Sequence, residues 1–129
     1  MIRSQVMFLR LVWLAGLTAV VIGSLAPAQS SVIGLLDRAH LNDKVQHFTA
    51  YALLAALPAL QRFRCRRPGT TVVSLFLLGT ALELGQLFSP GRSCDWHDLA
   101  ANYCGILTGT ALVRIFQTFT RHAPDSGPG

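Results

Sequence analysis

Four long apolar stretches constrain the fold of this chain more than any other feature of its sequence. They cover about residues 7–26, 45–60, 70–88 and 99–119. Each is close to the ~20 residues with which a helix crosses the ~30 Å hydrocarbon core of a bilayer. Only 13% of the residues are charged, about half the share in a typical soluble domain. The sequence therefore predicts a single all-α domain over residues 1–129, an integral membrane four-helix bundle.

The rest of the composition excludes other classes of protein. A net charge of +5 is typical of nucleic-acid binders, but a small soluble protein cannot bury this share of apolar residues. No nucleic-acid partner is therefore expected, and a soluble helical bundle is the less favoured alternative. The cysteines include no C-x-x-C, and the sequence holds no H-E-x-x-H. We therefore expect no metal and no cofactor.

The distribution of arginine predicts how the four stretches are oriented. Residues 61–69 hold four arginines and no acid. Arg3 and Arg10 flank the first stretch, and Arg114 and Arg121 lie at the end of the fourth. The other two connections carry at least as many acids as basic residues. Because Lys and Arg gather in cytoplasmic loops, both termini and the arginine-rich connection are expected in the cytoplasm.

The two ends of the chain carry separate predictions. Ala26-Pro27-Ala28, which follows the first apolar run, is typical of a signal-peptidase site. Cleavage there would remove the first helix and leave three spans, and this alternative stays open. At the other end, residues 122–129 are mostly small or polar and are predicted to form a disordered tail.

Polar residues gather at the ends of the stretches that are expected to face outward. Asp43, His47 and Tyr51 are spaced by four and share one helix face, since residues four apart are neighbours on a helix. Ionisable groups in a membrane are costly, so they are expected to pair or to serve a function. The predicted cluster comprises Asp43, Lys44, His47, Tyr51, Glu83, Gln86, Arg92, Asp98 and Asn102.

A stripe of small residues continues the polar face of the fourth stretch. Asp98, Asn102, Gly105 and Gly109 follow one another at steps of four, three and four. Gly105 and Gly109 form a G-x-x-x-G, which permits close approach of helices in lipid. The stripe is expected to press this face against another helix of the bundle and to turn the polar groups inward. A second copy of the chain is the alternative partner for the stripe.

Three short motifs carry a likeness to a known family. They are Asp43-Lys44-Val45-Gln46-His47, Glu83-Leu84-Gly85-Gln86, and the run from Asp98 to Gly105 with Arg92 before it. On these residues the chain resembles the VanZ-like family of small bacterial membrane proteins, over about residues 8–118. The resemblance implies a multi-pass protein of the bacterial inner membrane and an association with resistance to glycopeptide antibiotics, teicoplanin in particular. It implies no defined biochemical activity.

Three functions stay open for the polar cluster, all with membrane lipids as neighbours. The first is recognition of an envelope lipid or a lipid-linked cell-wall intermediate, with Lys44 and Arg92 holding phosphate. The second is a structural network that fixes helix register in a membrane scaffold or partner protein. The third is an intramembrane hydrolase or transferase acting on a lipid headgroup, with His47, Glu83 and Asp98 as acid–base candidates. Recognition is the function that the sequence favours.

Overall fold

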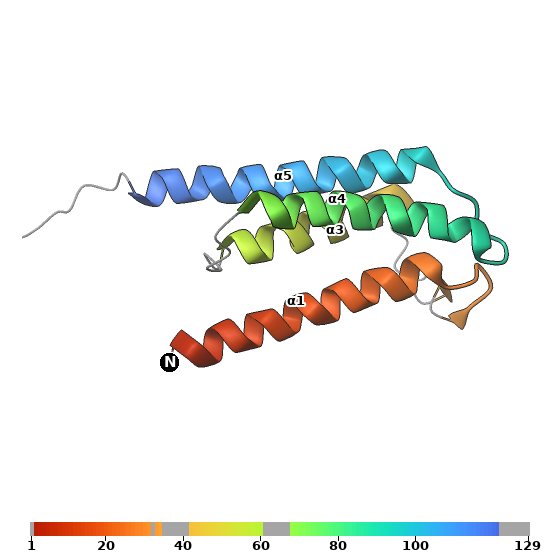
Figure 1. Ribbon diagram of the computed structural model, residues 1–129, viewed down its shortest axis with the longest axis horizontal. Helices are drawn as coiled ribbons and strands as arrows, with labels where there is room; N and C mark the ends of the chain where they lie inside the picture. Colours follow the sequence, from red (N-terminus) through yellow and green to blue (C-terminus); the bar gives the residue numbers. More distant parts are fainter. Residues whose placement is uncertain (1, 32, 35–41, 61–67, 122–129) are drawn as a thin grey trace, which may run out of the picture.

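The computed structural model describes residues 2–31, 33–34, 42–60 and 68–121, and helix labels follow Figure 1. The long helices are α1 (Ile2–Leu25), α3 (Asp43–Leu60), α4 (Pro68–Gly85) and α5 (Trp96–Arg121). A short 3-10 helix, η1 (Gln86–Phe88), continues α4. No strand occurs in the described ranges, so the all-helical prediction is confirmed. Most of the arginine-rich connection and the predicted tail lie outside the described residues.

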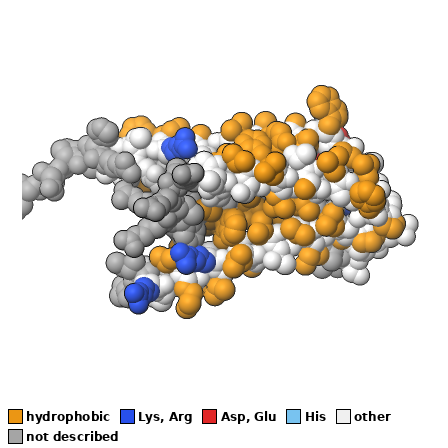
Figure 2. Space-filling model, in the orientation of Figure 1, with side chains coloured by type: hydrophobic (Ala, Val, Ile, Leu, Met, Phe, Trp, Pro, Cys, Tyr) orange, Lys and Arg blue, Asp and Glu red, His pale blue; other side chains and the backbone are white. Residues whose placement is uncertain are grey.

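Three of these helices are long and apolar enough to cross a membrane. The segments are Arg3–Leu25, Gly69–Phe88 and Trp96–Thr120. α3 is not among them, because its first turn carries Asp43 and Lys44 and its second carries further polar residues. Figure 2 shows apolar side chains spread over the visible face of the molecule, as expected of a surface that meets lipid.

α3 and α5 share the most extensive contact between helices, because α5 presents glycine to the backbone of α3. A Cβ atom at Gly105 would overlap the carbonyl oxygen of Phe48, and a Cβ at Gly109 would overlap that of Ala52. The small-residue stripe of α5 therefore lies against another helix of the same chain. α4 completes a buried core with this pair, formed by Tyr51, Leu54, Ala55, Leu75 and Ile106.

α1 runs alongside the other helices and diverges from them toward its N-terminal end (Figure 1). Trp13 and Leu17 pack against the core. Pro58 has no N–H group, so the carbonyl of Leu54 has no donor one turn later in α3. The indole Nε1 of Trp13 donates a hydrogen bond to this carbonyl at 2.9 Å. α1 thus satisfies the acceptor that the proline leaves free and is joined to α3 at this level of the bundle.

Candidate functional site

The sequence-predicted polar residues lie at the end of the bundle where α1 and α4 finish and α3 and α5 begin (Figure 1). Five of them are buried: Tyr51, Glu83, Gln86, Asp98 and Asn102. The structure divides the set into three groups. One group links α3 to α5, one is buried without hydrogen-bond partners, and one lines a cavity between α1 and α3.

The first group is a hydrogen-bonded network between α3 and α5. The ammonium of Lys44 donates to Asp95 at 3.2 Å and to Asp98 at 3.1 Å. One turn further into the bundle, Nδ1 of His47 lies 2.9 Å from the amide oxygen Oδ1 of Asn102. Because an amide oxygen only accepts hydrogen bonds, Nδ1 is the donor. The network fixes the register of α3 against α5 just outside the glycine stripe.

Asp95 caps the N-terminus of α5, and hydrogen bonds stabilise the charged form of its carboxylate. Its carboxylate accepts hydrogen bonds from the backbone N–H of His97 at 2.8 Å and from the ring of the same residue at 2.9 Å. These two bonds and, to a smaller extent, the bond from Lys44 lower the pKa of Asp95 to about 2. Asp95 is therefore ionised at neutral pH.

The second group is buried and has unused hydrogen-bonding capacity. The hydroxyl of Tyr51, both carboxylate oxygens of Glu83 and the amide nitrogen of Gln86 have no hydrogen-bond partner among the described residues. Gly79 leaves room for the Tyr51 ring, which lies 3.4 Å from the position of a Cβ built there. Glu83 is one turn beyond Gly79 on α4 and lies close enough to His47, Asp98 and Asp43 for their charges to act on it. Buried polar groups are rarely left unpaired, so this group is unusual for the interior of a helical protein.

Arg92 closes the end of α1. Its guanidinium donates to the carbonyl oxygens of Gly23 at 3.0 Å and Ala26 at 3.3 Å. The hydroxyl of Ser89 donates to the carbonyl of Leu25 at 2.6 Å. These carbonyls belong to the last turn of α1 and the residue after it, where a helix leaves acceptors unpaired. The connection between η1 and α5 therefore ties down the C-terminal end of α1.

The third group lines a cavity of about 580 Å³ between α1 and α3. Its polar lining comprises Ser24, Asp43, Gln46, His47, Thr49, Tyr51 and Arg92, and the remainder is Ala19, Val20, Gly23, Ile33, Ala50 and Leu53. Lys44, Glu83, Gln86, Asp98 and Asn102 are not part of this lining. Lys44 is instead held between its two aspartates. Of the two residues expected to hold a phosphate, only Arg92 therefore lines the cavity.

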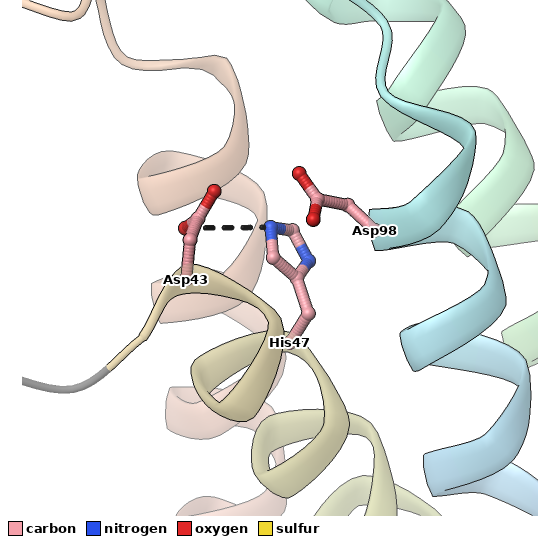
Figure 3. A group of neighbouring side chains, drawn as sticks. All are labelled: Asp43, His47 and Asp98. Carbon is pink, nitrogen blue, oxygen red and sulfur yellow. Dashed lines mark ion pairs between the residues drawn. The ribbon is translucent and has the colours of Figure 1, made fainter.

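Three side chains of the site converge from two helices (Figure 3). Asp43, His47 and Asp98 each offer an atom with a lone pair, and these atoms lie within 4.8 Å of one another. Nε2 of His47 is 3.9 Å from Oδ1 of Asp43. Figure 3 shows the Asp98 carboxylate turned toward the same imidazole. All three belong to the predicted cluster.

The sequence reasoning missed the wall that α1 contributes to the cavity. Ala19, Val20, Gly23 and Ser24 lie on an apolar helix with little polar patterning. The small residues Gly23 and Ser24 near the end of this helix were the available signal. It also missed the bond of 2.6 Å between the hydroxyl groups of Thr80 and Tyr103, which links α4 to α5.

Fold and site together define a class: a small helical protein whose helices can span a membrane and which gathers buried polar groups at one end. Comparison with known families narrows this class. The family model described as VanZ/LLP1 matches residues 5–117, and the chain belongs to this VanZ-like family. The resemblance seen in the motifs is thus confirmed. No curated protein matches the chain, and no solved structure matches it either.

Proposed function

We propose that this protein recognises the headgroup of an envelope lipid, or of a lipid-linked cell-wall intermediate, at the outer surface of the bacterial inner membrane. The cavity between α1 and α3 carries this proposal. Asp43 and Arg92 make its wall polar near the helix ends, whereas Ala19 and Leu53 make it apolar deeper in the bundle. A lining of this kind matches an amphiphile, and about 580 Å³ lies within the usual range for small-molecule sites.

The lining residues suggest how a headgroup would be held. Arg92 has five N–H donors and uses two of its nitrogens on α1, so donors remain for a phosphate. Asp43 and Gln46 offer acceptors and an amide for hydroxyl or amine groups. Ala19, Val20 and Leu53 would lie along the first part of an acyl or prenyl chain. Binding is proposed rather than catalysis, because His47 and Asp98 are engaged by Asn102 and Lys44.

The same proposal includes a membrane orientation for a single multi-pass domain. α3 has 18 residues and is about 27 Å long at the helical rise, so it serves as the fourth span of the bundle. Arg3 and Arg10 lie in the N-terminal half of α1 and Arg114 in the C-terminal half of α5, away from the site. Figure 2 shows Lys and Arg side chains gathered toward one end of the molecule. The acids of the site lie at the other end. By the positive-inside rule, we place both termini in the cytoplasm.

Labelling of Cys94 tests the orientation. Cys94 is exposed in the connection before α5, at the end proposed to face outward. In a variant that keeps only this cysteine (Cys65→Ser with Cys104→Ser), a membrane-impermeant maleimide should label Cys94 in intact spheroplasts. The matched variant that keeps only Cys65 should be labelled only after permeabilisation. The reverse pattern would place the polar site in the cytoplasm and remove the proposed ligand class.

Filling the cavity tests lipid recognition. An Ala19→Trp variant places a large ring in the apolar part of the cavity and should weaken lipid binding at least tenfold. Native mass spectrometry of the purified protein with phosphatidylglycerol, phosphatidylethanolamine or a polyprenyl phosphate measures this change. Ala81→Trp is the control, since Ala81 is exposed on α4 and does not line the cavity. Equal binding by both variants would show that lipid does not occupy this cavity.

The link to glycopeptide resistance is a further part of the proposal. Glycopeptide antibiotics act on lipid-linked cell-wall material outside the membrane, and the VanZ-like family is associated with teicoplanin resistance. A protein that binds such an intermediate at the outer leaflet would act where the antibiotic acts. Expression of the wild type and of Ala19→Trp in a sensitive host, followed by teicoplanin susceptibility, connects the cavity to this phenotype.

A further inference from the structure

We propose that Asp43, His47 and Asp98 bind a divalent transition-metal cation of the Zn²⁺ type on the wall of the cavity. Asp43 and His47 come from successive turns of α3, and Asp98 comes from the first turn of α5. Their lone-pair atoms lie within 4.8 Å of one another. The proposal does not depend on lipid recognition, because a cation would bind to these side chains without a lipid.

The tautomer of His47 prepares it as a ligand. Nδ1 donates its proton to the Asn102 oxygen at 2.9 Å, so neutral His47 carries its lone pair on Nε2. This lone pair faces Oδ1 of Asp43 at 3.9 Å. A cation between these two atoms would bind both of them. Metal-binding histidines commonly donate their other ring N–H to an oxygen that fixes the ring, which is the arrangement of His47 and Asn102.

The two carboxylates complete the set of donors. Lys44 donates to Oδ1 of Asp98, and the second oxygen of that carboxylate would bind the cation. The Asp43 side chain is 56% exposed and begins α3, so it has room to approach. Zn²⁺ binds nitrogen and oxygen ligands at about 2.0–2.2 Å. The three donors would therefore draw together by a small movement, most of it made by Asp43.

Glu83 provides an independent observation that points to a cation. Its side chain comes from α4, is 1% exposed, and has neither carboxylate oxygen in a well-formed hydrogen bond, with the backbone N–H of Asp95 as a weak donor. Glu83 lies near the three ligands, close enough for the charges of His47, Asp98 and Asp43 to act on its carboxyl group. A buried carboxylate without a partner is costly. A dication held by the three ligands would stabilise a carboxylate at this place.

The donor set indicates the kind of metal. One imidazole nitrogen with carboxylate oxygens suits Zn²⁺, whereas Mg²⁺ and Ca²⁺ prefer oxygen ligands alone. Three protein ligands leave a fourth position of a tetrahedral site open. Because Asp43 and His47 line the cavity, this open position would face its interior.

Zinc titration of the purified full chain in detergent tests the proposal. Isothermal titration calorimetry should show one saturable Zn²⁺ site per chain that millimolar Mg²⁺ does not displace. Asp43→Asn, at an exposed position where folding should be retained, should weaken Zn²⁺ binding at least tenfold, and His47→Gln should do the same. His97→Asn is the matched control, because His97 is an exposed histidine outside the group.

Three outcomes would overturn the metal site. One is the absence of saturable Zn²⁺ binding by the wild type. Another is unchanged affinity in Asp43→Asn, which decides the matter if His47→Gln does not fold. The third is loss of binding in His97→Asn with the site otherwise intact, which would place the metal on the surface around Asp95.

Discussion

A Gly109→Ala variant is expected to lose about 3 kcal/mol of folded stability, at the upper end of what overpacking a helix contact costs. The added Cβ would overlap the carbonyl of Ala52 and would approach its backbone carbon at 2.9 Å. Backbone atoms cannot rotate away as side chains do, so α3 and α5 must separate. Thermal unfolding in detergent measures the loss, and Gly105→Ala should act in the same direction through Phe48.

Gly69→Ala is the matched control for the glycine stripe. A Cβ at this position of α4 meets no atom within 4 Å. Alanine is the better helix former by about 1 kcal/mol, so this change should leave stability unaltered or raise it slightly. If Gly109→Ala unfolded at the same temperature as Gly69→Ala, the close contact between α3 and α5 would be refuted.

Lys44→Met is expected to give the second large loss of stability. The Asp98 side chain is 8% exposed and accepts a hydrogen bond from the ammonium of Lys44. Removing one partner of a pair is costly when the other stays buried and charged. We therefore expect a drop in unfolding temperature second only to that of Gly109→Ala, with weakened contact between α3 and α5.

A second substitution separates lost pairing from other effects. Adding Asp98→Asn to Lys44→Met removes the unpaired charge of the buried Asp98 carboxylate. The double variant should therefore regain much of the lost stability. Asp95→Asn is the control, because Asp95 is more exposed and its loss strands no buried charge. A double variant less stable than Lys44→Met alone would contradict this account of the network.

Much of the fold followed from the sequence because apolar length and helix periodicity are local properties. The described helices overlap all four apolar stretches, although α1 begins at Ile2 and α5 at Trp96, earlier than predicted. Helix starts were harder to predict, since polar residues continue a helix as readily as apolar ones do. The capping of α5 by Asp95 fixes its start in the structure.

The sequence predicted only part of the way in which the polar residues are distributed between the α3–α5 network and the cavity beside α1. Spacing of four predicts that Asp43, His47 and Tyr51 share a face of α3, but a face can meet two neighbours at once. His47 donates to α5 while it also lines the cavity beside α1. The partners of Arg92 are backbone carbonyls at the end of α1. Every residue has such a carbonyl, so the sequence does not indicate which ones Arg92 binds. The cavity depends on the path of α1, whose own sequence has little polar pattern.

The bond between Trp13 and the Leu54 carbonyl gives the protein a built-in optical reporter. The chain has two tryptophans, and Trp96 is 74% exposed at the other end of the site. The indole of Trp13 is part-buried and hydrogen-bonded across two helices. Its fluorescence in a Trp96→Phe background therefore follows the approach of α1 to α3 without an added dye.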